Sequence, residues 1–223
     1  GETPADADTT AVTLYALARL GRAPGVSPLA GFDTGRHFCT WPGEDGASLT
    51  TNAHVLDALG EQPSGPGVTG ARHRVTEWLL DRQEPDGRWE DRWHASPYYA
   101  TYAVLLALSD HAPDGAARAA VERGVAWLLA TQRRDGSWGR WDGTAEETAY
   151  AVLALADAGR PGDARVTSAL ARGRSRLSEL DGSDGEPALW HDKDLYRPTR
   201  IVRAAVLAAS GSAGAAGRRP HPP

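Results

Sequence analysis

The chain of 223 residues has no methionine, one cysteine, one lysine and two phenylalanines. The single cysteine, Cys39, excludes a disulfide within the chain. No apolar run is long enough to cross a membrane and no signal-peptide pattern opens the sequence, so we expect a cytoplasmic protein. The missing methionine indicates a processed chain or a piece of a longer protein.

The chain also lacks a strong excess of charge of one sign. It has 24 Lys and Arg residues against 29 Asp and Glu residues, which gives a formal net charge of −5. Surfaces that bind nucleic acid or anionic membranes normally carry a basic excess, so we expect no nucleic-acid partner. Hydrophobic residues make up 41% of the chain, which is ordinary for a globular domain that needs no disulfides.

In contrast, the chain is rich in tryptophan, with eight residues, and it contains an internal repeat. The segment QEPDGRW at residues 83–89 returns as QRRDGSW at residues 132–138, and a degenerate copy lies further upstream. Each copy stands between two apolar helical segments. In such a repeat the Gln and the Trp tie the end of one helix to the start of the next. We therefore predict a structural role for four residues: Gln83, Trp89, Gln132 and Trp138.

The apolar periodicity between these motifs is helical, and no segment alternates as a sustained strand would. Gly21, Gly60 and Gly159 stand where helix C-termini would take a left-handed residue. Ser96 and Asp114 suit helix starts.

The repeat fixes the predicted fold class. We predict an all-α domain over residues 1–210, with about eight to ten helices in antiparallel pairs of roughly 45–50 residues. Such pairs bury their apolar faces only by stacking on one another, so the expected architecture is an α/α toroid, or barrel. Residues 211–223 are predicted to form a flexible tail.

Two carboxylates occur at the start of the first predicted helix, in the segment DADTTA at residues 6–11. Asp6 and Asp8 can simply cap this helix, because its first backbone N–H groups need acceptors. Alternatively, two carboxylates this close share a proton, which keeps one of them available as an acid. The spacing alone leaves both interpretations open.

Three further blocks occur in order along the chain: WHASPYYAT at residues 93–101, EETAY at residues 146–150 and LWHDKDLYRP at residues 189–198. DADTTA resembles the DxDD or DxDTT motif of class II terpene cyclases. The QxxDGxW segments resemble the QW repeats of the squalene–hopene cyclase superfamily. The three blocks resemble those of class II diterpene cyclases of the bacterial ent-copalyl diphosphate synthase type.

This resemblance implies roles for five polar residues. Asp8 takes the position of the general acid, and Asp6 would modulate its acidity. Thr9 stands where the commoner motif has a third Asp, and it can only form hydrogen bonds. In relatives an Asn in the helix of the degenerate repeat bonds the catalytic Asp; here His54 is nearest to that position. Asn52 lies two residues away on the same helix, so Asn52 and His54 cannot both point at Asp8.

The resemblance also implies a cavity lined by aromatic side chains, because such faces stabilise a carbocation. Our candidates for the lining are Trp93, Tyr98, Tyr99, Trp141 and Tyr196. Lys193, the only lysine, would either approach the diphosphate of the substrate or form a salt bridge to another domain. The sequence does not decide between these two roles.

The implied activity is that of an isomerase. Geranylgeranyl diphosphate would be converted to a copalyl diphosphate, in the ent form, by protonation-initiated bicyclisation. The DDxxD motif that binds metal and ionises a diphosphate in class I terpene synthases is absent, so the diphosphate is expected to survive into the product. No metal ligands are predicted in this chain. Mg²⁺ would be bound mainly by a second α-barrel domain, absent from this chain, and by the diphosphate itself.

That second domain would pack against this one and complete the active site, so the isolated chain is expected to have little activity. A homodimer is also left open. Three alternatives are retained. They are a triterpene-type class II cyclase, a non-catalytic α/α toroid in which Asp6 and Asp8 are only caps, and an α/α-barrel glycosidase. An apolar, aromatic-lined pocket with one buried acid favours a cyclase, and a wide polar groove favours a glycosidase.

Overall fold

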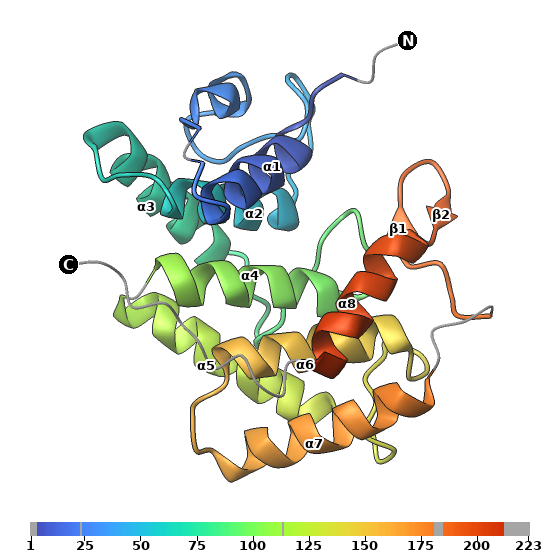
Figure 1. Cartoon of the computed structure of the whole chain (residues 1–223). Coiled ribbons are helices and arrows are strands. Elements are labelled where there is room, and N and C mark those ends of the chain that lie inside the picture. Colours follow the sequence, from blue (N-terminus) through green and yellow to red (C-terminus); the bar gives the residue numbers. More distant parts are fainter. Residues whose placement is uncertain (1–3, 23, 113, 181–184, 212–223) are drawn as a thin grey trace.

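The computed structural model describes residues 4–22, 24–112, 114–180 and 185–211, and these residues are mostly helical (Figure 1). One short 3-10 helix and one small hairpin interrupt the α-helices. In chain order the elements are α1 (Ala7–Arg19), η1 (Ser27–Phe32), α2 (Leu49–Gly60), α3 (Pro66–Leu80), α4 (Pro97–His111), α5 (Gly115–Thr131), α6 (Ala145–Ala158), α7 (Ala164–Glu179), β1 (Trp190–His191), β2 (Leu195–Tyr196) and α8 (Thr199–Gly211).

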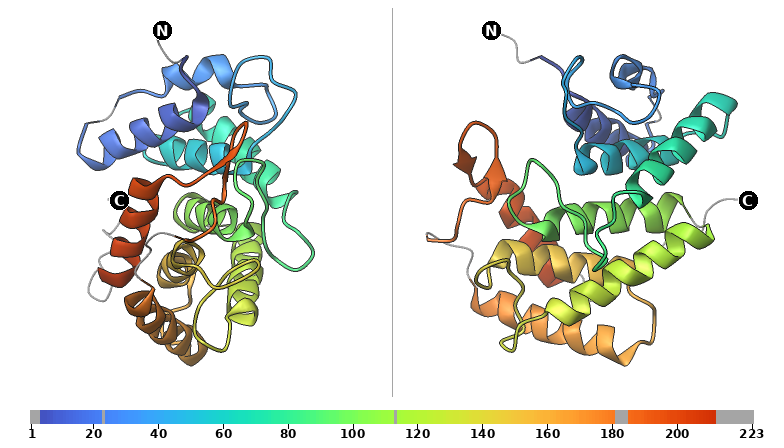
Figure 2. Two further views of the ribbon diagram at one scale, coloured as in Figure 1. Left: turned by 90° about the vertical axis from the view of Figure 1, so that its right-hand side faces the viewer. Right: turned by 180° about the vertical axis from the view of Figure 1, so that it is seen from behind.

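The helices form two layers. In the inner layer α1 packs on α2, α2 on α4, α4 on α6 and α6 on α8, while α3, α5 and α7 cover the outside of α2, α4 and α6. Figure 2 shows this curved double layer from two further directions. The inner helices α4 and α6 bury almost their whole length. The predicted all-α fold class and the α/α toroid are confirmed.

The first QW repeat links three helices. The Gln83 side-chain amide donates to the carbonyls of Gly87, within the repeat, and of Ala120 in α5, each at 2.8 Å. The Trp89 indole N–H donates to the Leu79 carbonyl in the last turn of α3 at 2.9 Å. The Thr101 hydroxyl of α4 accepts from the Trp89 backbone N–H. Trp89 is completely buried, so its ring also fills the space between the layers.

The second repeat makes the same contacts one helix pair later. Gln132 donates to the carbonyls of Gly136 and of Ala169 in α7, at 3.0 and 2.9 Å, and the indole of Trp138 donates to Leu128 at 2.8 Å. Gly136 has φ of +90°, and a Cβ there would lie 2.8 Å from the backbone oxygen of Arg172. Only glycine fits this close approach without strain. The predicted structural role of the Gln and Trp residues is confirmed.

The predicted helix boundaries need one correction. Ser96 and Asp114 are N-caps as expected, and Gly21 has φ of +77° at the end of α1. Gly159 has φ of −66°, and Gly60 lies within α2, so the left-handed assignment is wrong for both. A Cβ on Gly60 would lie 2.0 Å from the ring of His111, and one on Gly159 would lie 2.2 Å from the Leu155 carbonyl oxygen. Both glycines therefore permit close packing rather than a turn.

The hairpin and the end of the chain complete the fold. Each strand of the hairpin has two residues, and Trp190 pairs with Tyr196. Strands this short show no alternation of apolar and polar residues, so the sequence does not reveal them. No helix within the described ranges is both long and apolar enough to cross a membrane. The last described residue is Gly211, so the rest of the predicted tail lies outside the described residues.

Candidate active site

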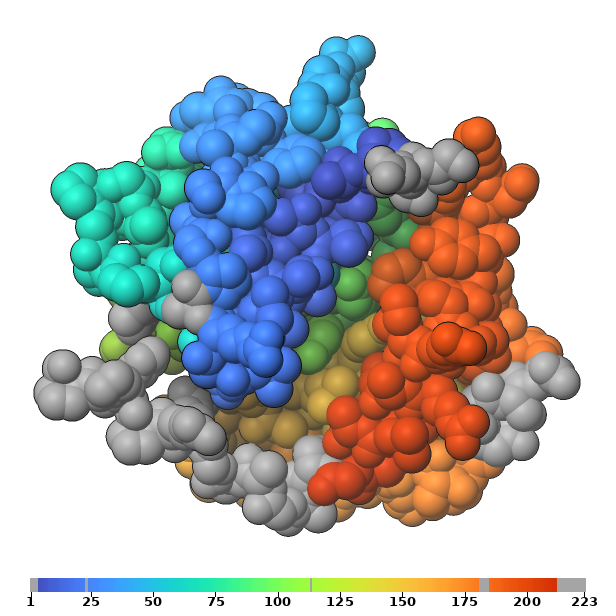
Figure 3. Space-filling view, turned by 45° about the horizontal axis from the view of Figure 1, so that its top comes forward, coloured from blue at the N-terminus to red at the C-terminus, as the bar shows by residue number. Residues whose placement is uncertain are grey.

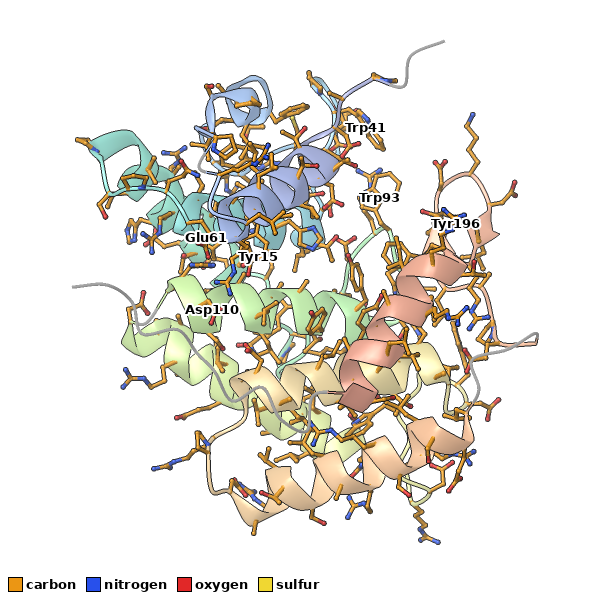
Figure 4. The ribbon with its side chains drawn as sticks, in the orientation of Figure 1. Tyr15, Trp41, Glu61, Trp93, Asp110 and Tyr196 are labelled. Carbon is orange, nitrogen blue, oxygen red and sulfur yellow. The ribbon has the colours of Figure 1, made fainter. Side chains whose placement is uncertain are left out.

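A cavity of about 260 Å³ lies where the N-terminal ends of α1, α2 and α4 meet the β1–β2 hairpin. Figure 3 shows a hollow on this side of the molecule, between the blue α1 region and the orange-red C-terminal segment. Figure 4 shows Trp41, Trp93 and Tyr196 around the same end of the helices. The lining consists of Asp6, Asp8, Thr9, Thr40, Trp41, Thr50, Thr51, Trp93, Tyr99, Trp190, His191, Asp192 and Tyr196.

The two carboxylates of the DADTTA segment have different partners. Asp6 is the N-cap of α1, and its Oδ1 accepts the Thr9 backbone N–H at 2.7 Å. Asp8 lies in the first turn of α1, and its Oδ1 lies 2.8 Å from Nδ1 of His54 in α2. Its side chain is 38% exposed, toward the cavity that it lines. Capping therefore accounts for Asp6 but not for Asp8.

Electrostatics favour the ionised form of Asp8. Burial raises the pKa of Asp8, but the charge and the hydrogen bond of His54, with a further bond from Thr51, outweigh burial and hold this pKa below its ordinary value. Burial lowers the pKa of His54, and Asp8 reverses this effect, so the pKa of the imidazole is raised. The N-terminus of α1 adds a positive potential beside the carboxylate. Both shifts favour an imidazolium paired with a carboxylate.

Asn52 and Thr9 are engaged in other contacts than a bond to Asp8. The Asn52 side chain donates to the carbonyls of Phe38 and Ser48 at 2.9 and 2.8 Å, and it accepts the Phe38 backbone N–H at 2.8 Å. It thus fastens the loop before α2 to this helix and does not bond Asp8. Thr9 lines the cavity, and its backbone N–H serves the cap of α1.

The aromatic candidates divide into two groups. Trp93, Tyr99 and Tyr196 line the cavity. Tyr98 is buried on another face of α4, with its ring 4.8 Å from that of Trp127. Trp141 is 60% exposed in the loop after the second QW repeat. The structure therefore does not bring Tyr98 and Trp141 to the cavity.

The β1–β2 hairpin places the basic candidate near the rim. Lys193 is exposed in the turn between the two strands, beside His191 and Asp192, which line the cavity. It is not itself a lining residue.

Sequence reasoning missed several lining residues, notably Trp41, Trp190 and the threonines of α2. Trp190 belongs to the LWHDKDLYRP block, so the resemblance could have identified it as a lining residue. Its ring centroid lies 4.7 Å from that of Tyr99. The indole of Trp41 meets that of Trp93 edge-on at 5.5 Å, and nothing in its loop sequence marks it as a site residue.

Asp91 was also missed, although it organises two walls of the cavity. Its Oδ1 accepts the N–H of Leu49 at 2.6 Å and the hydroxyl of Ser48 at 2.9 Å, at the start of α2. Its Oδ2 accepts the N–H of Trp93 at 2.9 Å. One carboxylate thus fixes the helix that bears His54 and the loop that bears Trp93.

Comparison with known proteins places this geometry in a family. Residues 44–199 match the family described as the squalene–hopene cyclase C-terminal domain. The chain belongs to this family. Its α/α toroid is also that of a solved ent-copalyl diphosphate synthase from Streptomyces platensis, with a TM-score of 0.89 and 48% sequence identity. That match covers 95% of this chain and 42% of the other.

Curated relatives show the same partial coverage. An ent-copalyl diphosphate synthase from Streptomyces sp. (strain KO-3988) is 46% identical over 209 residues, which are 92% of this chain and 40% of that protein. A labda-7,13-dienyl diphosphate synthase from Streptomyces clavuligerus is 47% identical over 207 residues, 91% of this chain and 37% of that protein. This member of the squalene–hopene cyclase family thus spans about two fifths of these relatives. Relatives of equal similarity carry names of different products.

The described residues offer no site for the expected metal ion. No group of three or more His, Cys, Asp or Glu side chains within them is arranged to hold one. Of the three acidic residues at the cavity, Asp6 caps α1, Asp8 pairs with His54 and Asp192 lies in the turn of the hairpin. Within the described residues, protein side chains alone therefore form no Mg²⁺ site.

Proposed function

We propose that this chain is the acid-bearing domain of a class II diterpene cyclase that converts geranylgeranyl diphosphate to a copalyl diphosphate of the ent form. The observation that carries the proposal is the pairing of Asp8 with His54 at an aromatic-walled cavity. Asp8 supplies the proton that starts bicyclisation. The diphosphate stays on the product, because protonation of the distal alkene replaces ionisation as the source of the cation.

The surroundings of Asp8 suit a strong acid. Protonation of a trisubstituted alkene creates a tertiary carbocation, which requires an acid stronger than an ordinary carboxylic acid. When Asp8 gives up its proton, its carboxylate gains a charge-assisted bond from His54 and the potential of the α1 N-terminus. Because both stabilise the conjugate base, both increase the acidity of the protonated form. In this proposal Asp6 acts only through the cap that sets the start of α1.

The walls suit the cation that follows. Ring faces of Tyr99, Trp190 and Trp93 surround the cavity, and aromatic faces attract a positive charge within about 6 Å of their centroids. Asp8 lines the same cavity, and its carboxylate becomes negative once the proton has been transferred. The cation is therefore stabilised by the new anion and by several π faces.

The cavity is smaller than a complete site for such a substrate. Small-molecule sites commonly measure roughly 300–1,000 Å³, and this one measures about 260 Å³. We propose that a second α-barrel domain forms the opposite wall and contributes the group that removes the last proton. Lys193, exposed on the hairpin, then lies where it can approach either the diphosphate or that domain.

The test uses the chain joined to the remaining segment of the Streptomyces platensis synthase, in place of the segment that it matches; we call this chimaera the completed enzyme. With geranylgeranyl diphosphate and Mg²⁺ it should yield a C20 diphosphate isomer of unchanged mass, with no release of pyrophosphate. Mass spectrometry and a pyrophosphate assay measure the two outcomes. Pyrophosphate formed in proportion to product would contradict the proposal. An enzyme that converts squalene but not geranylgeranyl diphosphate would contradict it as well.

The other candidates lack comparable support. In a non-catalytic toroid both carboxylates would be caps, whereas Asp8 is paired with the partly buried imidazole of His54 instead. A glycosidase needs two carboxyl groups on opposite sides of the scissile bond. Asp6 and Asp8 follow each other in one helix start, and Asp6 is engaged by the Thr9 N–H.

A further inference from the structure

A buried polar cluster of Glu146, His94 and Tyr150 lies next to the cavity residues Trp190 and Tyr99. The proton transfer proposed above does not use this cluster. Glu146, in the first turn of α6, is 1% exposed. Its Oε1 accepts the indole N–H of Trp190 at 2.6 Å and lies 3.2 Å from Nε2 of His94. A buried carboxylate is costly unless its partners compensate for lost hydration. A buried glutamate at this position therefore indicates a function that an apolar residue of the same size could not perform.

The cluster acts on two rings of the cavity. Trp190 and Tyr99 both line it, with their centroids 4.7 Å apart, and the imidazole of His94 lies 5.3 Å from the ring of Tyr99 on the inner side. Two backbone bonds dock the hairpin that bears Trp190 to the segment before α4, namely His191 N–H to the Trp93 carbonyl and Ala95 N–H to the Leu189 carbonyl, and the ring of His94 also meets that of Trp190. The Trp190 indole N–H donates to Glu146, and its ring packs against the rings of Tyr99 and His94.

We propose that Glu146 is a positioning residue that locks the Trp190 indole in one orientation against Tyr99 and so determines how the polyene chain folds before cyclisation. By accepting the hydrogen bond from the indole N–H, Glu146 also increases the electron density of the Trp190 ring. A more electron-rich ring attracts a cation more strongly. Both effects act through Trp190, because Glu146 itself does not line the cavity. This inference rests on the proposed function, and it concerns product specificity rather than proton transfer.

A second observation supports a tuned cluster rather than plain packing. The other oxygen of Glu146, Oε2, and the hydroxyl of Tyr150 are both buried without a hydrogen-bond partner. The two residues are four apart on α6, so they share one face of the helix. Burial and the nearby Glu146 charge raise the pKa of Tyr150. Buried polar groups are normally paired, so these two atoms set Glu146 and Tyr150 apart from residues that only pack.

Glu147 offers a matched control. It is also 1% exposed, and it stands next in sequence. Its partners are the Ser96 hydroxyl, the Thr144 hydroxyl and the Arg140 backbone N–H, none of which belongs to the hairpin. Replacing either glutamate with glutamine removes one buried carboxyl group and keeps the side-chain shape. Only the replacement at 146 should alter Trp190.

The first measurement needs no turnover and uses the 223-residue chain itself. The indole N–H resonance of Trp190, assigned by its loss in Trp190→Phe, should move upfield in Glu146→Gln, because a neutral amide oxygen is a weaker acceptor than a carboxylate. It should keep its position in Glu147→Gln. An unmoved resonance in Glu146→Gln, or the same shift in both variants, would overturn the proposal.

The second measurement uses the completed enzyme. Glu146→Gln should lower kcat about tenfold, change KM less than about threefold and redistribute product among C20 diphosphate isomers. Glu147→Gln should keep the product ratio of the unmodified enzyme. An unchanged ratio in Glu146→Gln would refute the specificity role. If the unmodified completed enzyme makes no product, the proposed function fails, whereas the indole resonance still decides the position of Trp190.

Discussion

Asp8→Asn in the completed enzyme should lower turnover of geranylgeranyl diphosphate by about 10³-fold, because it removes the proton donor and leaves the cavity otherwise intact. Asparagine matches the shape of aspartate and can still accept a bond from His54. Substrate binding should therefore change little, and the loss should appear in kcat. Initial rates over a range of substrate concentrations separate kcat from KM.

Asp6→Asn is the control for this substitution. Asparagine is as good an N-cap as aspartate, so α1 should start in the same place. We expect a loss of less than about tenfold, which is the scale of an indirect influence on the acidity of Asp8. Melting temperatures of both variants exclude a loss of fold. Turnover by Asp8→Asn within about tenfold of the unmodified enzyme would refute the assignment of the acid.

His54→Gln should lower the maximal rate about 10²-fold and shift the pH dependence. Glutamine can donate to Asp8 but carries no charge. Because the charge of His54 is what outweighs burial, its removal lets burial raise the pKa of Asp8. A larger fraction of Asp8 is then protonated at neutral pH, but each proton is held more tightly and is transferred more slowly.

The sign of the shift distinguishes this account from a merely structural His54. In the unmodified enzyme the rate should increase as the pH falls, because the active form has a protonated Asp8 whose pKa lies below the ordinary range. In His54→Gln the rate should level off at a higher pH and at a lower plateau. A pH–rate curve that keeps its inflection while the rate drops would show that His54 does not set the acidity of Asp8.

The sequence predicts the framework of this site well. Helical periodicity and the QW repeats give the toroid, since each Gln and Trp bonds backbone groups at fixed offsets that recur from one repeat to the next. The proximity of His54 to Asp8 follows from resemblance, because the two residues lie on different helices and no local pattern links them.

The walls of the cavity are harder to predict. Neighbouring residues on a helix point about 100° apart, so of Tyr98 and Tyr99 only one can face the cavity, and both lie in the same aromatic block. Trp190 reaches Tyr99 through a hairpin with two-residue strands, which has no periodic signature. Contacts such as Glu146 with Trp190 depend on how three distant segments pack, and a single sequence does not show this.

Incorporation of solvent deuterium tests the central claim most directly, namely that Asp8 starts the reaction by protonating a carbon–carbon double bond. Carboxyl protons exchange with solvent, so in D₂O the completed enzyme should place one deuterium on a ring carbon of each product molecule. Mass spectrometry of the dephosphorylated product should show an increase of one mass unit over the product made in H₂O. A product of unchanged mass, accompanied by free pyrophosphate, would contradict protonation by Asp8 and indicate ionisation of the diphosphate instead.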